Sequence, residues 1–203
     1  MSSLYMKILT LPGILVALCF HEFAHAWMSD KLGDPTPRMQ GRLTVNPAAH
    51  IDLIGFVCLL ICGFGWGKPV QINPYYYKKR RRDELLVAVA GVVMNLLLAI
   101  LFSIPTKFLQ TVYYATGSGL IEIAFYVCLF TVQINLCLMI FNLIPCPPLD
   151  GWGILTQLVD LEKYRWYDTV YRYGGWILLV LIMFNVTDII LMPCINFFMN
   201  LLF

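Results

Sequence analysis

The sequence has few charged residues. Only 13% of its 203 positions are Asp, Glu, Lys or Arg, whereas 60% are hydrophobic. Soluble domains have about 25% charged residues and are about half apolar, so this composition excludes an ordinary water-soluble globule and indicates solvation by lipid. The length allows one domain. We therefore expect a single membrane-embedded domain over residues 1–203, with a core at 8–160 and C-terminal helices at 174–203.

The sequence also shows no sign of a disulfide framework or of a cleavable signal peptide. The seven cysteines are scattered through apolar segments, where a free thiol behaves as a small buried hydrophobe. The first apolar stretch continues past signal-peptide length and no small-residue cleavage pattern follows it. We therefore expect a multi-pass protein of the cell membrane whose first helix stays in place.

Long apolar segments dominate what is present. About 20 residues of helix cross a hydrocarbon core of about 30 Å. Four segments reach this length: Ile8–Met28, Leu85–Pro105, Leu120–Ile144 and Gly174–Pro193. A fifth apolar piece, Ile51–Phe64, is shorter, which is typical of a re-entrant or interfacial element.

Positive charge predicts which side each segment faces. A basic block, Lys78–Arg82, lies between apolar segments, which favours a cytoplasmic topology marker over a nucleic-acid site. Lys31 and Arg38 precede the short piece and Lys68 follows it. Both flanks of the short piece are thus predicted to be cytoplasmic, so it enters and leaves on one side. We expect the lipid bilayer as a partner and no nucleic acid.

Two stretches beside the short piece have a strand pattern. Arg42–Val45 and Pro69–Ile72 alternate polar with apolar residues and end at Asn-Pro turn signals. The expected fold is an α-helical integral membrane protein. It has about four transmembrane helices, a short re-entrant or interfacial helix and a small β element on the cytoplasmic side.

The chemically informative motif is His21-Glu22-Phe23-Ala24-His25, inside the first span. Residues i and i+4 share a helix face, so both imidazoles can reach one metal ion with Glu22 beside them. Ionisable residues within a transmembrane segment are costly, and three in one turn indicate a functional site.

Zinc in a catalytic site needs a third protein ligand and an open position for water. Asp150 follows a proline-rich stretch, 145–148, that cannot continue a regular helix, so its carboxylate can turn inward to the metal. The alternative is that Asp150 caps a helix starting at Gly151. His50 is the remaining histidine and is either a ligand, a partner of a ligand, or a turn residue. Glu162 and Glu122 are the other candidates for a third ligand.

These motifs resemble the site-2 protease family of intramembrane metalloproteases in its short prokaryotic form. The resemblance rests on the His-Glu motif in a spanning helix, on Leu149-Asp150-Gly151 downstream, and on the Gly91–Asn95 pattern in the helix between them. It implies His21, His25 and Asp150 as zinc ligands, with one zinc ion per chain and Glu22 as general base.

Two asparagines match the family pattern less completely. Asn142 is similar to an asparagine implicated in holding substrate, although it could instead satisfy carbonyls freed by the prolines. Gly91–Asn95 is similar to the family's Gly-Pro-x-x-Asn pattern, with Val92 in place of the proline. Either Asn142 or Asn95 could donate to the oxyanion of the reaction.

The expected function is hydrolysis of a peptide bond in a transmembrane or membrane-proximal segment of a membrane-protein substrate, at a site toward the cytoplasmic side. One alternative is a membrane metalloprotease of another class, with a glutamate as third ligand. Another is a metal transporter or an inactive metal-binding scaffold. A transporter should carry ionisable residues along several spans, whereas here they cluster at one depth.

Overall fold

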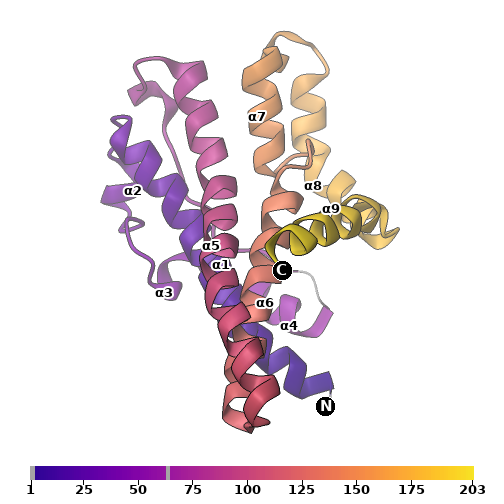
Figure 1. The fold of residues 1–203 in the computed structure, drawn as a ribbon. Helices are drawn as coiled ribbons and strands as arrows, with labels where there is room; N and C mark the ends of the chain where they lie inside the picture. Colours follow the sequence, from indigo (N-terminus) through magenta and orange to yellow (C-terminus); the bar gives the residue numbers. More distant parts are fainter. Residues whose placement is uncertain (1–2, 63–64) are drawn as a thin grey trace.

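Three long helices form the centre of the molecule. The computed structural model describes residues 3–62 and 65–203. Helices α1 (Ser3–Lys31), α5 (Arg80–Thr116) and α6 (Gly119–Asn142) pack side by side (Figure 1). Each contains a segment long and apolar enough to cross a membrane. This confirms three of the four predicted spans.

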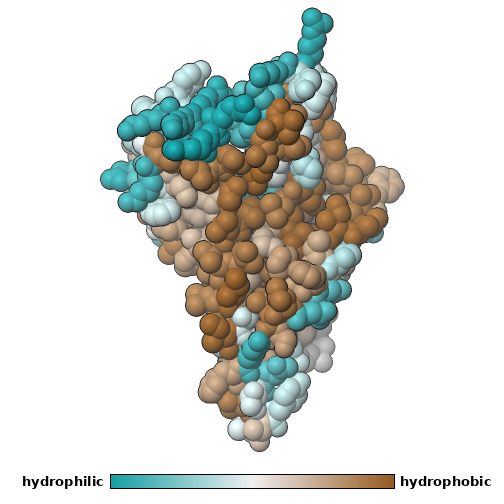
Figure 2. Space-filling model, turned by 45° about the horizontal axis from the view of Figure 1, so that its top comes forward, coloured by the Kyte–Doolittle hydropathy of each residue, from teal (hydrophilic) through white to brown (hydrophobic). Residues whose placement is uncertain are grey.

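The surface of the bundle is apolar where a bilayer would contact it. Large hydrophobic side chains on α5, including Leu97, Leu101 and Ile104, are exposed. Figure 2 shows a broad apolar zone between hydrophilic ends. The interior of the bundle is also apolar, and its buried residues include Val92, Ala99, Val132, Leu136 and Met139. The molecule is therefore a membrane protein whose helices pack internally and contact lipid externally.

The fourth predicted span is broken. Helices α8 (Tyr167–Met183) and α9 (Val186–Leu202) meet at an angle of 71° instead of forming one continuous helix over Gly174–Pro193. Asn185 lies between them with a φ of 54°, in the left-handed region that ends a helix. After the bend, α9 packs on the bundle through Leu191 and its neighbours, so the pair forms at most one bent span.

The predicted re-entrant piece is a short helix, α4 (Leu53–Cys62). The end of the predicted range, residues 63–64, lies outside the described part of the chain. Two helical turns, α2 (Thr36–Met39) and α3 (Pro47–His50), precede α4, and a 3-10 turn, η1 (Pro74–Tyr76), follows it.

The predicted β element is wrong. Within residues 3–62 and 65–203, the only pairing is an isolated antiparallel bridge between Ile51 and Gly67. A side chain links the two segments instead: Arg42 donates to the carbonyl oxygens of Ala49 and Lys68. The alternating pattern could not reveal these side-chain bonds.

The proline-rich stretch turns the chain from α6 into α7 (Asp150–Val159). A short 3-10 turn, η2 (Leu161–Lys163), then leads to α8. Helix α7 packs beside the start of α5, and Arg81 of α5 donates to the Gln157 carbonyl of α7 at 2.7 Å. This packing holds the first turn of α7 against the histidines of α1.

Candidate metal centre

Helix α1 carries His21, Glu22 and His25 at the middle of the bundle. The two imidazoles lie on one helix face with ring centroids 4.6 Å apart. Both are buried, with 5% and 9% of their surface exposed. The i, i+4 spacing thus places both rings on a buried face rather than toward lipid.

Asp150 is the first residue of α7 and joins the histidines. Its Oδ2 lies 3.2 Å from His21 Nε2 and 3.3 Å from His25 Nε2. The residue at the N-cap position is Leu149, and no side chain caps this helix. Asp150 therefore contacts the two histidines and does not cap α7.

Gly151 explains how the first turn of α7 comes so close to the end of α6. A Cβ at this position would lie 2.5 Å from the Ile144 carbonyl oxygen, so only glycine allows the approach. The Leu-Asp-Gly sequence thus combines a candidate ligand with the residue that lets it reach the site.

Outer partners fix the orientation of both imidazoles. His25 Nδ1 lies 2.8 Å from the Val87 carbonyl oxygen, which can only accept, so this nitrogen carries the proton. His21 Nδ1 lies 2.7 Å from Asn95 Oδ1. Asn95 Nδ2 donates to the Ala17 carbonyl, which identifies Oδ1 as the acceptor facing His21. Both Nε2 atoms therefore direct lone pairs toward the centre of the site.

The three converging atoms fit a zinc ion. His21 Nε2 and His25 Nε2 are 3.0 Å apart, and Asp150 Oδ2 is buried without a hydrogen-bond partner. Tetrahedral ligands at 2.0–2.1 Å from zinc lie about 3.3 Å from each other, close to the three separations here. Two lone pairs and a carboxylate at this distance repel one another unless a cation lies between them.

Asp150 is poised as an anion. Burial alone would raise the pKa of Asp150, but positive charge on His25 and hydrogen bonds from the two histidines outweigh burial and hold the pKa well below its ordinary value. A metal ion would take the place of that positive charge. An ionised carboxylate and two neutral imidazoles are the forms that bind a metal.

Glu22 faces the same cleft and has a partner that the sequence did not indicate. Its Oε2 accepts a hydrogen bond of 2.9 Å from the Val70 backbone N–H. Val70 belongs to one of the two stretches predicted as strands. The irregular chain over residues 68–72 thus contacts a side chain of α1 rather than another strand.

The asparagines occupy different positions. Asn95 is fully buried, and its amide nitrogen also donates to Asn135 Oδ1 at 2.9 Å, so its polar atoms are occupied by protein groups. Asn142 lines the cleft, and its amide nitrogen donates to the Leu138 carbonyl one turn earlier. The structure therefore places Asn142, and not Asn95, where a substrate could touch it.

The other sequence candidates lie away from the three ligand atoms. His50 is buried, and its Nε2 bonds the Thr44 carbonyl at 2.6 Å, as a turn residue does. Glu162 lies 3.6 Å from Arg80 at the rim of the cleft. Glu122 is in the first turn of α6. In the described part of the chain, the one group able to share a metal is His21, His25 and Asp150.

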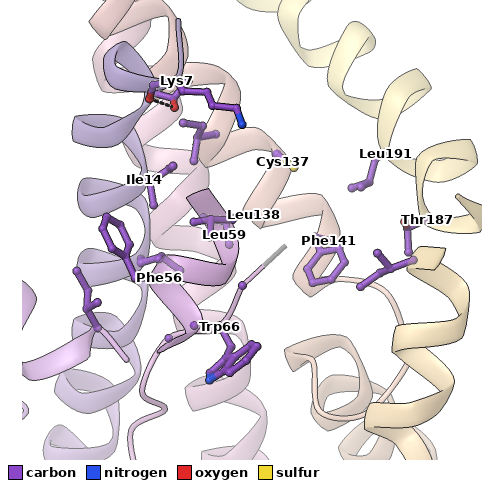
Figure 3. Close-up of a pocket in the computed structure, with 18 of the residues that line it drawn as sticks. Lys7, Ile14, Phe56, Leu59, Trp66, Cys137, Leu138, Phe141, Thr187 and Leu191 are labelled. Carbon is purple, nitrogen blue, oxygen red and sulfur yellow. Dashed lines mark hydrogen bonds between the residues drawn. The ribbon is translucent and has the colours of Figure 1, made fainter. Parts of the chain in front are cut away.

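The site opens into a cleft of about 440 Å³. Its walls include α1, the 69–74 stretch, the first turns of α5, and α7. A second, apolar cavity of about 530 Å³ is lined in part by Trp66 and Gly67 (Figure 3). Residues labelled in Figure 3 around it include Ile14, Phe56, Leu138 and Phe141.

Sequence comparison agrees with the geometry. The family model described as Peptidase family M50 matches residues 9–184. "Putative zinc metalloprotease YwhC" of Bacillus subtilis is 36% identical over 188 residues, which cover 90% of this chain and 84% of the relative.

More distant relatives carry the same kind of name. "Putative zinc metalloprotease Rip2" of Mycolicibacterium smegmatis is 29% identical over 86% of this chain, and the match spans 66% of that relative. "Putative zinc metalloprotease MJ0611" of Methanocaldococcus jannaschii is 27% identical over 75% of this chain and 72% of the relative. No solved structure gives a significant match. With the converging His-His-Asp group, these matches show that the chain is a membrane protein of peptidase family M50, the site-2 protease family, with zinc as its cofactor.

Proposed function

We propose that the chain is an intramembrane endopeptidase that hydrolyses a peptide bond in, or next to, a transmembrane segment of another protein. The observation that carries this proposal is the convergence of His21, His25 and Asp150, at 3.0–3.3 Å from each other, with Glu22 in the same cleft. Because His21 and Glu22 are part of a membrane-spanning helix, the reacting bond must come to that depth.

The residues have distinct roles in this proposal. His21, His25 and Asp150 would hold the zinc ion, which would supply Lewis acidity toward a water molecule and a peptide carbonyl. Glu22 takes the proton from the attacking water and delivers it to the leaving amine. The Val70 N–H keeps the Glu22 carboxylate in place. Asn142, on the cleft wall, donates to the substrate carbonyl once it exchanges its internal partner.

Asn95 has a positioning role rather than an oxyanion role. Its amide oxygen holds His21 Nδ1, and both ends of its amide are occupied by protein groups. Partners of this kind orient metal ligands and set their basicity. The sequence hypothesis that Asn95 contacts the oxyanion is therefore replaced here by a bond to His21.

The apolar cavity offers a place for the substrate's membrane segment. Leu18 lines the cavity and lies one helical turn before His21 and Glu22, which line the cleft. Phe141 and Asn142 are neighbours in sequence and line the cavity and the cleft, respectively. A helix docked in the cavity could thus pass an unwound end into the cleft along the 66–70 stretch. Arg80, from the basic block 78–82, pairs with Glu84 and Glu162 on the cleft wall, which supports a cytoplasmic opening.

The test uses purified full-length protein with a panel of single-span substrates in detergent. Wild type with zinc should cleave a member of the panel, and a chelator should stop the reaction. Glu22→Gln should retain zinc yet lose at least about 1,000-fold in rate, because an amide cannot take the proton from the attacking water. Full cleavage by Glu22→Gln would disprove the assigned mechanism.

A metal transporter is the rival from another class. Among the described residues, the candidate ligands form one group at one depth, without a second group along the bundle. Zinc flux into liposomes that contain the protein separates the two functions, since the proposal predicts none above the rate of empty liposomes.

A further inference from the structure

One arginine is buried without an acidic partner. Arg42 has only 7% of its surface exposed. Buried arginines are normally paired with carboxylates, because an uncompensated charge is costly to bury. Arg42 forms no ion pair with a described residue. Its Nη1 donates instead to two backbone carbonyl oxygens, those of Ala49 and Lys68. The role of this buried charge therefore lies in the backbone that it holds.

The backbone of Lys68 is held at both of its polar atoms. Its carbonyl oxygen accepts from Arg42 Nη1 at 3.2 Å, and its N–H donates to the His50 carbonyl oxygen at 2.8 Å. His50 is itself fully buried, and its Nε2 donates to the Thr44 carbonyl oxygen at 2.6 Å. The segment over residues 42–50 thus fixes the position of Lys68.

A short and stiff connection leads from Lys68 to the catalytic carboxylate. Val70 follows two residues later, and its N–H donates to Glu22 Oε2 at 2.9 Å. Pro69 lies between them. Its ring fixes its own φ and restricts the backbone of the residue before it. The position of Lys68 therefore largely sets the position of the Val70 N–H.

We propose that Arg42 is a positioning residue for Glu22: it holds Lys68 and thereby keeps the Val70 N–H against the Glu22 carboxylate. The inference rests on the proposed protease function, in which Glu22 moves the proton. Arg42 is not among the described residues that line the cleft, so it acts through the backbone and not by touching the substrate. Because both of its bonds come from one nitrogen, a lysine ammonium with three N–H donors can replace the guanidinium.

The first measurement needs no substrate. Hydrogen–deuterium exchange, read by mass spectrometry on zinc-loaded full-length protein in detergent, reports how often the amides over residues 66–73 lose their bonds. Arg42→Met keeps a long side chain without donors, and should raise exchange in this segment about 10-fold with zinc content unchanged. Arg42→Lys should exchange at the wild-type rate. Arg38→Met is the matched control, because Arg38 is an exposed arginine paired with Asp30, and should leave exchange in the segment unchanged.

The second measurement is a double-mutant cycle on the cleavage rate. Arg42→Met should lower kcat about 10-fold in the wild-type background. In the Val70→Pro background, where the N–H is already missing, Arg42→Met should lower kcat by less than about 2-fold. Arg42→Lys should restore most of kcat. An arginine with a purely structural role would instead lower kcat by the same factor in both backgrounds.

The positioning role is rejected if Arg42→Met exchanges at the wild-type rate over residues 66–73, or if faster exchange spreads over all helices as the thermal midpoint falls. Equal losses of kcat in the two backgrounds reject it as well. Arg42→Gln repeats both measurements if Arg42→Met does not fold, and failure of both variants to fold would show that Arg42 supports the whole fold instead. If wild type cleaves nothing while exchange still depends on Arg42, the protease function fails and the hold of Arg42 on this segment stands.

Discussion

Gly91 on α5 lies directly against the His21 imidazole on α1. A Cβ at Gly91 would lie 2.6 Å from His21 Cε1 and would also overlap His25 Nε2. The Gly-x-x-x-Asn pattern therefore has a physical meaning. Gly91 provides the room for the metal ligands, and Asn95, one turn later on the same helix, holds His21 Nδ1 at 2.7 Å.

Gly91→Ala should cause loss of zinc without loss of the fold. The added methyl displaces both imidazoles from their positions in the ligand triangle, so zinc affinity should fall at least about 10- to 100-fold. Metal analysis of purified protein after dialysis measures this. Gly175→Ala is the matched control, because a Cβ at Gly175 meets nothing within 4 Å. Full zinc content in Gly91→Ala would contradict the packing described here.

Asn95 and Asn142 should separate zinc binding from substrate binding. Asn95→Leu removes the partner of His21 Nδ1, so zinc affinity should fall about 10- to 100-fold. Asn142→Ala should keep zinc at the wild-type level and slow cleavage. Competition with a chromophoric chelator gives the affinities, and substrate kinetics give the second effect. If Asn142→Ala reduced zinc affinity and Asn95→Leu left zinc affinity unchanged, the two assignments would be reversed.

Val70 should act through its backbone N–H. Val70→Pro deletes the donor to Glu22 Oε2 while leaving an extended chain possible. Because Glu22 then lacks its positioning bond, kcat should fall about 10-fold or more with zinc content unchanged. Val70→Ala is the control, since it removes the side chain but keeps the N–H. Equal kcat values for the two variants would show that this hydrogen bond has no part in the reaction.

Asp34 should link stability to acid pH. It is fully buried beyond the end of α1, and its Oδ2 accepts hydrogen bonds from Ser29 Oγ at 2.8 Å and from the Asn73 N–H at 2.7 Å. Burial alone would raise the pKa of Asp34, but hydrogen bonds from Thr36, Asn73 and Ser29 outweigh burial and hold the pKa below its ordinary value. The carboxylate is therefore more stable in the folded state than in the unfolded state.

Because folding lowers the pKa of Asp34, its ionised carboxylate stabilises the fold at pH values above about 4, the ordinary pKa of an aspartate. This stabilisation is lost as the pH falls below about 4. Thermal unfolding in detergent between pH 7 and pH 3 measures this loss. Asp34→Asn should lower the midpoint by about 5 °C at pH 7 and should flatten the acid dependence, because it cannot ionise. Asp168→Asn, at an exposed position, is the control. A pH profile for Asp34→Asn as steep as that of wild type would contradict the linkage.

The sequence predicted the parts of the structure that depend on local pattern. Apolar length identified α1, α5 and α6, and the spacing of His21 and His25 placed both imidazoles on one face. Asp150 could be proposed because the prolines before it end α6. These inferences need only helix periodicity, chain length and the chemistry of zinc ligands.

Features that depend on contacts between distant segments could not be predicted in this way. The alternating pattern at 69–72 predicted a strand, but the partner of the Val70 N–H is a carboxylate 48 residues earlier in the sequence. The break between α8 and α9 depends on the left-handed conformation of Asn185, which an apolar run does not reveal. The bond between Asn95 and His21 joins α5 to α1 across 74 residues of sequence, and no local pattern indicates such a contact.

X-ray absorption at the zinc edge tests the central claim most directly. Purified wild type loaded with one equivalent of zinc should show four nitrogen or oxygen neighbours at about 2.0–2.1 Å, with the multiple-scattering signature of two imidazoles. Asp150→Ala should keep that imidazole signature while losing an oxygen neighbour or binding zinc more weakly. A sulfur neighbour at about 2.3 Å, a third imidazole, or a spectrum unchanged in Asp150→Ala would contradict the assignment of His21, His25 and Asp150 as the metal ligands.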